Sequence, residues 1–180
     1  MTSFYSEEEL KQIGFRTLGT DILISRKVSI YGAEHISIGN HVRIDDFCIL
    51  SGYITLGNYI HIAAYAALYG GESGIFLEDY ASLSSRVTVY GASDDYSGEA
   101  LTNPMVPDEL RNVQIGPVHI EKHVIVGATS IILPGITLRE GSAFGSFSFI
   151  NKDSESWSIN TGIPARKIKD RSRKILDVCL

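Results

Sequence analysis

Three side chains of this sequence are suited to moving a proton: the adjacent carboxylates Asp94 and Asp95, and the imidazole of His61. Apolar residues flank His61, so we expect it to point outward from a strand, stacked between Arg43 and Ser82 on neighbouring strands. An ordinary imidazole has a pKa of about 6.5 and an ordinary carboxylate a pKa of about 4, so imidazole is the stronger base. Paired carboxylates attract the ammonium form of an amine. These residues predict a general base that acts on a nucleophile, with an amine acceptor as one hypothesis.

Each of these residues also has a purely structural interpretation. The acidic pair is compatible with an Asx-type turn at the start of a loop, and His61 is compatible with a surface imidazole that has no task. Cys48 falls on an inward-facing position, which argues against a cysteine nucleophile. Four weaker candidates for holding an acceptor are Tyr96, Arg86, Asn103 and Glu72.

Composition limits the classes of partner. The chain has 180 residues and a formal net charge of -5, and it carries no basic run before its last twenty residues, so we expect no wide contact with nucleic acid. Its two cysteines, Cys48 and Cys179, have neither metal-ligand nor disulfide-framework spacing, which favours a reducing compartment. The polar N-terminus and the lack of a long apolar run predict a cytoplasmic protein with no membrane span and no metal.

A sixfold repeat must position the candidate residues. From residue 38 onward a large aliphatic or aromatic side chain returns at every sixth position: Ile38, Ile44, Leu50, Leu56, Ile62, Leu68, then Leu77, Leu83, Val89, and finally Ile120, Val126, Ile132, Leu138, Phe144, Ile150. A period of six fits short strands joined by tight corners, with three units to a coil of 18 residues. Stacked coils would place Ile38, Leu56, Leu77, Ile120 and Leu138 in one internal column. The alternative is an antiparallel β-sandwich of short strands.

The departures from the repeat predict three regions. Residues 1–20 are expected to form a helical cap, because Ser6 and Glu9 have the spacing of a capping box. Residues 21–153 are expected to form the β-helix, with a functional loop at residues 93–116 that leaves the pattern entirely. Residues 154–180 form a C-terminal extension whose basic cluster suggests a small phosphorylated ligand.

The repeat, the segment VHIEKHVIVGATSIILPGITLREGSAFGSFSFINKD and the tail TGIPARKIKDR together resemble the hexapeptide-repeat acyltransferases, nearest to the galactoside and maltose O-acetyltransferase branch. The resemblance covers residues 24–172. It implies an all-β fold, a left-handed parallel β-helix, together with a homotrimer and acetyl-CoA bound in a groove between subunits. The handedness comes from the resemblance alone, since general rules favour right-handed crossovers.

The resemblance also implies a set of CoA-binding residues. Ala128 and Ser146 match small residues whose backbone faces the pantetheine arm, and Asn151 and Lys152 match a pair near the adenine and phosphate end. Arg166 and Lys169 match a basic tail that reaches the phosphates of CoA. The acceptor side departs from the family, because Asp94 stands where the sugar O-acetyltransferases have a catalytic histidine. Arg86 similarly stands in place of an asparagine.

The function expected from the sequence is acetyl transfer from acetyl-CoA to a sugar, by direct attack with a general base and on either oxygen or nitrogen. A nucleotide-linked amino sugar used in surface polysaccharide synthesis is one acceptor that fits the acidic pair. Two other classes stay open: a non-catalytic assembly protein that binds CoA or sugar, and, more remotely, a zinc hydratase resembling carbonic anhydrases that share this architecture.

Overall fold

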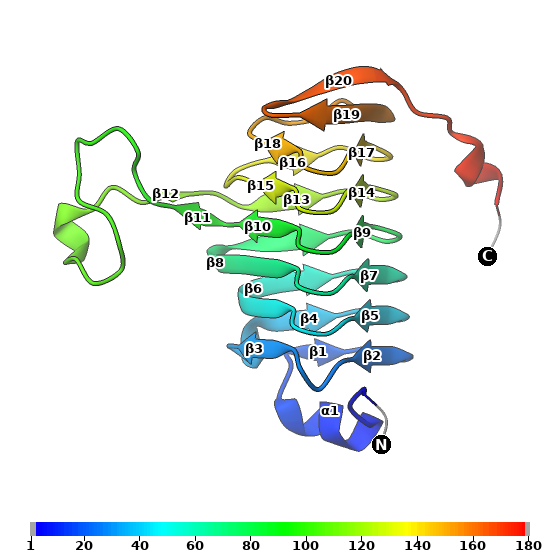
Figure 1. The fold of residues 1–180 in the computed structure, drawn as a ribbon. Helices are drawn as coiled ribbons and strands as arrows, with labels where there is room; N and C mark the ends of the chain where they lie inside the picture. The colour runs from blue at the N-terminus through cyan, green and yellow to red at the C-terminus, as the bar shows by residue number, and fades with distance from the viewer. Residues whose placement is uncertain (1–2, 179–180) are drawn as a thin grey trace.

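The structure, a computed structural model, describes residues 3–178 and has the form of a β-solenoid of about seven turns with one short N-terminal helix (Figure 1). Helix α1 (Glu7–Ile13) begins at the predicted capping box: Ser6 Oγ accepts from the Glu9 backbone N–H at 3.3 Å, and the Glu9 carboxylate accepts from the Ser6 N–H at 2.7 Å. The first paired strand, β1 (Thr17–Leu18), lies inside the range that the sequence assigned to the cap.

Parallel strands stack along three faces of the solenoid. One face carries β2 (Ile22–Ile24), β5 (Val42–Ile44), β7 (Ile60–Ile62), β9 (Ser82–Leu83), β14 (Ile125–Val126), β17 (Ala143–Phe144), β19 (Ser158–Gly162) and, antiparallel at the end, β20 (Ala165–Asp170). A second face carries β1, β4 (Ile36–Ile38), parts of β6 (Ile49–Leu56) and β8 (Ala67–Leu77), β13 (Val118–Ile120) and β16 (Thr137–Leu138). The third carries β3 (Ser29–Tyr31), the other parts of β6 and β8, β10 (Thr88–Tyr90), β15 (Ile131–Ile132) and β18 (Phe149–Ile150). The predicted β-solenoid is confirmed, and its pairing is parallel, so the sandwich alternative is wrong.

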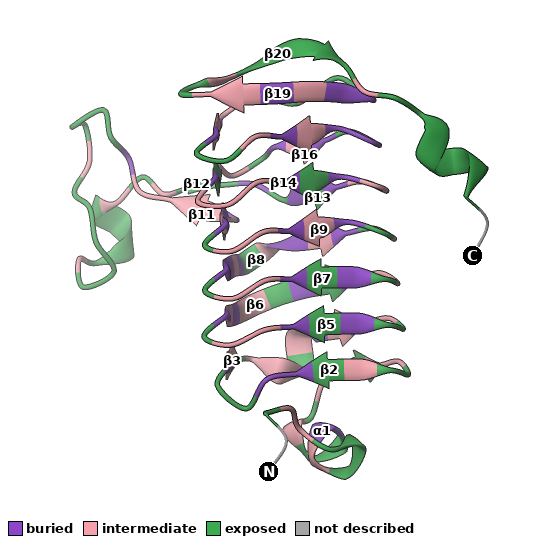
Figure 2. Ribbon diagram, turned by 45° about the vertical axis from the view of Figure 1, so that its right-hand side comes forward, coloured by how far each residue is buried: buried purple, intermediate pink, exposed green. Residues whose placement is uncertain are grey.

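The register confirms the predicted internal column. Ile38 pairs with Leu56, Leu56 with Leu77, Leu77 with Ile120 and Ile120 with Leu138. All five side chains are buried, as are the corresponding residues of the other two faces (Figure 2). The repeat gains three residues between Leu68 and Leu77. They are taken up by register shifts where β6 pairs with β8, since Ser51 pairs with Tyr69, Gly52 with Gly71 and Ile54 with Ile75.

Short elements lie outside the stacked strands. They are η1 (Ala33–His35), the antiparallel pair β11 (Ala92–Ser93) and β12 (Gln114–Ile115), η2 (Asp108–Leu110) and η3 (Lys174–Asp177). The C-terminal basic residues lie on the β19–β20 hairpin and the segment that follows it (Figure 1). No helix among residues 3–178 is long and apolar enough to cross a lipid bilayer. Cys179 lies outside the described residues.

Candidate active site

The excursion from the solenoid leaves and returns through a narrow neck. Strands β11 and β12 pair antiparallel, and the Gly116 N–H donates to the Gly91 carbonyl at 3.0 Å. Both glycines are required by packing: an added Cβ would lie 2.5 Å from the Gly70 oxygen at position 91 and 2.7 Å from the Gly135 Cα at position 116. The neck therefore fixes both ends of residues 94–113, which we call the arm, beside the C-terminal coils.

A hollow of about 890 Å³ opens where the arm meets the solenoid. Its size falls in the usual range for small-molecule sites. The arm and its neck contribute Ser93, Asp94, Asp95, Tyr96, Ser97 and Gln114, and the coils contribute Tyr90, Ile131, Leu133, Pro134, Ile136, Phe149 and Asn151. The lining residues from the arm and neck are thus mostly polar or acidic, whereas those from the coils are largely apolar. This arrangement suits a ligand that has both a charged group and a hydrophobic part.

The two adjacent carboxylates have different surroundings. Asp95 is buried, and its oxygens accept from the backbone N–H and the hydroxyl of Ser97, both at 2.8 Å. These hydrogen bonds, the backbone one first, lower the pKa of Asp95 and build the Asx-type turn that the sequence left open. Asp94 is half-buried and accepts only a long hydrogen bond, 3.4 Å, from the Asn103 N–H to Oδ2. Its Oδ1 has no hydrogen bond to any of residues 3–178, so Asp94 is the carboxylate with a free oxygen.

The four candidates for holding an acceptor fall into two groups. Tyr96 lines the hollow and is almost fully exposed, and Asn103 bonds to Asp94 while its side chain accepts from the Met105 N–H at 3.0 Å. Arg86 and Glu72 do not line the hollow. The Arg86 guanidinium lies 5.4 Å from the centre of the Tyr65 ring on a corner of the solenoid, and Glu72 is exposed within β8.

His61 lies between Arg43 and Ser82 in register, as predicted, but on the face formed by β5, β7 and β9 rather than beside the hollow. Its Nε2 lies 2.9 Å from Asp45 Oδ2, and the other Asp45 oxygen accepts from Arg43 Nε at 2.8 Å. Partial burial acts to raise the pKa of Asp45, but the hydrogen bonds from His61 and Arg43 outweigh it and lower the pKa. Within one copy of the chain, His61 therefore does not line the hollow that contains Asp94.

Ala128 and Ser146 stack on successive coils at one corner. Ala128 follows β14 and Ser146 follows β17, and the Phe147 N–H donates to the Ala128 carbonyl at 2.9 Å. An added Cβ on Gly127 would lie 2.5 Å from the Ser146 nitrogen, so this corner is tightly packed backbone. Ala128 is half-buried and Ser146 is exposed, so both small residues of this corner have access to solvent.

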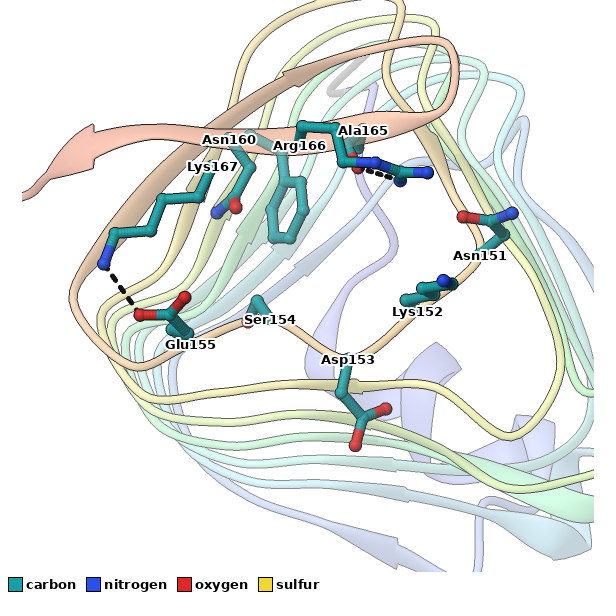
Figure 3. Close-up of a pocket in the computed structure, with 10 residues that line it drawn as sticks. Asn151, Lys152, Asp153, Ser154, Glu155, Asn160, Ala165, Arg166 and Lys167 are labelled. Atoms are coloured by element: carbon teal, nitrogen blue, oxygen red, sulfur yellow. Dashed lines mark hydrogen bonds and ion pairs between the residues drawn. The ribbon is translucent and has the colours of Figure 1, made fainter.

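A second hollow, of about 280 Å³, lies at the C-terminal end of the solenoid and shares Asn151 with the first. Figure 3 shows Asn151, Lys152 and Arg166 on one side of it, and Lys167 with Glu155 on the other. Lys167 is held by Glu155 at 2.7 Å and Asp170 at 2.9 Å, with Asp170 the larger cause of a pKa raised to about 12. Three nearby cations form no ion pair with residues 3–178: Lys152, Arg166 and Lys169. Of these, Lys152 and Arg166 line the hollow and Lys169 does not. Three of the six expected CoA-binding residues thus meet here, with two unpaired cations.

Sequence reasoning missed several residues of the first hollow, chiefly Tyr90, Gln114 and Phe149. The Tyr90 ring stacks on Tyr69 at 5.5 Å, and burial, followed by the neighbouring phenols of Tyr69 and Tyr96, raises the Tyr90 pKa. Tyr90 therefore stays a hydrogen-bond donor at neutral pH. Its position directly before the excursion was the available signal, because an outward residue there must face the arm.

The remaining histidines occupy ring stacks. His119 stacks on Phe76 at 4.9 Å and His123 on Tyr80 at 5.0 Å, while His35 and His41 stack on Tyr53 and Tyr59. Within the described part of the chain no three His, Cys, Asp or Glu side chains gather as metal ligands.

Comparison with known proteins gives close relatives, although no family model matches the chain. The dTDP-4-amino-4,6-dideoxy-D-glucose acyltransferase of Escherichia coli is 45% identical over 179 residues, covering 98% of this chain and 93% of that protein. The crystal structure of AntD, an N-acyltransferase from Bacillus cereus, in complex with dTDP and 3-hydroxybutyryl-CoA is 56% identical. It covers 98% of this chain and 94% of that one, with a TM-score of 0.97.

The galactoside acetyltransferase structure with coenzyme A is more distant, at 19% identity and a TM-score of 0.61, over 93% of this chain and 70% of that one. The expected nearest branch was therefore wrong. The galactoside enzyme shares the solenoid fold, so the sixfold repeat could not separate the two branches. The chain belongs to the hexapeptide-repeat acyltransferases, and within them it groups with the dTDP-amino-sugar acyltransferases rather than with the galactoside O-acetyltransferases.

Proposed function

We propose that this acyltransferase moves an acyl group from acyl-CoA to the amino group of a nucleotide-linked amino sugar of the dTDP-4-amino-4,6-dideoxyglucose type. The observation that carries the proposal is the Asp94 carboxylate, which lines the larger hollow and has one oxygen without a hydrogen bond to residues 3–178. A carboxylate attracts the ammonium group of an amino sugar, and it accepts a proton more readily from an ammonium than from a sugar hydroxyl. The identity of the nucleotide and of the sugar in this proposal is taken from the relatives, which are described with dTDP-4-amino-4,6-dideoxyglucose.

The reaction needs no covalent enzyme intermediate. The amine nitrogen attacks the thioester carbon, the C–N bond forms and the C–S bond breaks. Of the two protons lost by the ammonium group, one passes to Asp94 and on to solvent, and the other ends on the departing sulfur of CoA. Asp95 remains ionised in its turn with Ser97 and holds the start of the arm, so it serves positioning rather than proton transfer.

Further support comes from the relatives. Solved structures of AntD include variants in which its Asp94 is replaced by Ala or Asn and its Ser84 by Ala, Cys or Thr. This chain has Asp94 and Ser84 at the same numbers. Ser84 lies at the corner preceding β10, and its N–H donates to the Val126 carbonyl at 2.9 Å.

On the donor side we propose that the thioester arm of acyl-CoA follows the Ala128 and Ser146 corner toward Asn151. Lys152, Arg166 and Lys169 would receive the phosphates. Ile131, Leu133 and Phe149 give the hollow an apolar lining, and its volume of about 890 Å³ is large enough for acyl groups longer than acetyl. This agrees with the 3-hydroxybutyryl-CoA complex of AntD. We also propose three copies per assembly.

The test is a thiol-release assay with acetyl-CoA and 3-hydroxybutyryl-CoA against dTDP-4-amino-4,6-dideoxyglucose, its 4-hydroxy counterpart and free sugars. We expect turnover of the amino sugar only. Asp94→Asn should lower kcat at least tenfold at unchanged thermal stability, whereas Asp95→Asn should mainly raise KM for the acceptor. His61→Ala is the control, because His61 does not line the hollow. Its kcat should stay within about threefold of the parent value, well short of the tenfold change, about 1.4 kcal/mol, expected for Asp94→Asn. Acylation of neutral sugars alone, or full activity of Asp94→Asn, would contradict the proposal.

A further inference from the structure

Two segments project from the solenoid and carry apolar side chains into solvent. In the arm, Tyr96 is 93% exposed and Met105 91%, and Leu101 and Leu110 are also exposed. After β20, residues 171–178, which we call the tail, expose Leu176 at 50% and Val178 at 70%. Figure 2 shows both segments largely exposed while the solenoid interior is buried. Exposed apolar side chains gathered on projecting segments mark interaction surfaces.

Both segments are held in place rather than loosely attached. The arm is fixed by its neck, by the Asp95 turn, by a bridge between Leu101 and Arg111, and by an ion pair of Arg111 with Asp108. The tail is anchored where it begins. Arg171 Nη1 donates to the carbonyls of His123 at 2.8 Å and Gly141 at 2.9 Å, and the Arg173 guanidinium lies 5.6 Å from the centre of the Trp157 ring. Their directions are therefore set in advance, which lowers the entropic cost of docking.

The two surfaces are complementary in charge. The arm contains five acidic residues and one basic residue, and the tail contains three basic residues and one acidic residue. Both segments also expose apolar side chains, so a contact would bury hydrophobic groups and bring opposite charges together. Complementary potentials of this kind steer association and select the partner.

The two surfaces cannot meet within one copy. Figures 1 and 2 show the arm and the tail on opposite sides of the solenoid, both beside its C-terminal coils. A contact between them must join two copies, and because the two surfaces differ, the contact is head-to-tail and closes into a ring when the rotation allows. We infer that the tail of one copy docks on the arm of the next copy.

The contact would complete the acceptor site, a step that rests on the proposed function. A nucleotide-linked sugar carries a diphosphate, and the carboxylates of the arm repel it even as they attract its ammonium group. The tail of the partner copy would bring Lys174, a cation with no ion pair among residues 3–178, next to this acidic arm. The ammonium group of the acceptor would then lie near the carboxylates of one copy, and its diphosphate near the Lys174 ammonium of the next copy.

Cross-linking between two tagged populations of the full-length chain tests the contact directly. One population carries Met105→Cys and the other Leu176→Cys, both in a Cys179→Ser background that leaves only the buried Cys48. After co-expression, a short bismaleimide should join one copy of each kind. The matched control replaces Leu176→Cys with Leu23→Cys, an exposed residue of β2 at the other end of the solenoid. Failure to cross-link at position 176, or equal yield at position 23, would overturn the inference.

A second measurement follows the assembly itself. Ile175→Asp combined with Leu176→Asp should lower the mass measured by light scattering at micromolar concentration and raise KM for the nucleotide sugar several-fold. Tyr31→Asp, an exposed aromatic on β3, should change neither. Unchanged mass and KM in the double variant would overturn the inference even if a cross-link formed. A cross-linked enzyme that acylates no amino sugar would instead refute only the proposed function.

Discussion

At the residue scale, neighbouring side chains of the same charge differ in how far their charges are satisfied by other residues. Asp94 and Asp95 are adjacent in sequence, yet the Ser97 hydrogen bonds occupy both oxygens of Asp95 and leave the Asp94 carboxylate facing the hollow. The same holds for Arg166 and Lys167: Lys167 is neutralised by two carboxylates, whereas Arg166 forms no ion pair within the described chain.

This difference between Arg166 and Lys167 gives a prediction for the donor. Arg166→Ala should raise KM for acyl-CoA about tenfold, equivalent to about 1.4 kcal/mol, because a charge-assisted contact to phosphate is lost. KM for the corresponding 3′-dephospho-CoA thioester should change little. Lys167→Ala is the matched control and should leave both KM values close to those of the parent enzyme, since its charge is already paired. Equal loss with both donors would place Arg166 away from the 3′-phosphate.

Burial raises the pKa of the Cys48 thiol from 9.0 to about 11. A raised folded-state pKa stabilises the protein fully below pH 9, and this contribution is lost as the pH rises toward 11, because the unfolded thiol ionises first. Urea unfolding between pH 8 and pH 11 should therefore show a steeper loss of stability for the parent chain than for Cys48→Ala. Native Cys48 should also resist maleimide at pH 7, since the thiolate is the reactive form. Parallel pH curves for the two chains would contradict the prediction.

At the scale of elements, internal columns support the strands and ring stacks support the corners. The φ angles of Tyr59, Tyr80 and His123 are 57°, 63° and 60°, in the left-handed region that costs branched or bulky side chains about 1–2 kcal/mol. Their rings stack on one another at 5.0 Å in each step, which offsets part of that cost. The corners thus depend on the coil above and the coil below.

The columns make a direct stability prediction. Leu83 is fully buried between Ile62 and Val126 in adjacent coils. Leu83→Ala should lower the free energy of unfolding by about 2–5 kcal/mol, because the interior cannot collapse onto the lost volume. Ser82→Ala, on the outward side of the same strand, should cost less than about 0.5 kcal/mol. Chemical denaturation of both variants provides the comparison, and similar costs would argue against an inward Leu83.

At the scale of the whole molecule, the charge is unevenly distributed. The net charge of -5 includes an acidic arm and a basic tail, and these two segments lie on opposite sides of the solenoid (Figure 1). Such a separation of charge favours association between copies over binding of a single-sign polymer.

The resemblance to hexapeptide-repeat acyltransferases implies three copies per assembly, and we expect the stability of this assembly to depend on protein concentration. A folded oligomer is stabilised by mass action, so the melting temperature should rise as the protein concentration is raised. Light scattering should give a mass three times that of the 19.7 kDa chain. A monomeric mass together with a melting temperature independent of concentration would contradict the proposed trimer.

Spacing along the chain was enough to predict the solenoid, the internal column from Ile38 to Leu138 and the capping box of α1. The first two follow from burial of apolar side chains at a period of six, and the third from the Ser6–Glu9 spacing. The sequence also marked the arm, since a stretch without the repeat cannot stack on its neighbours. Only the folded structure shows that His61 lies away from Asp94, that Ser97 holds Asp95 in a turn, and that Tyr90 and Phe149 line the same hollow. Those relations join residues from different coils and faces, and no local pattern encodes which outward side chains face the same hollow once the coils have stacked.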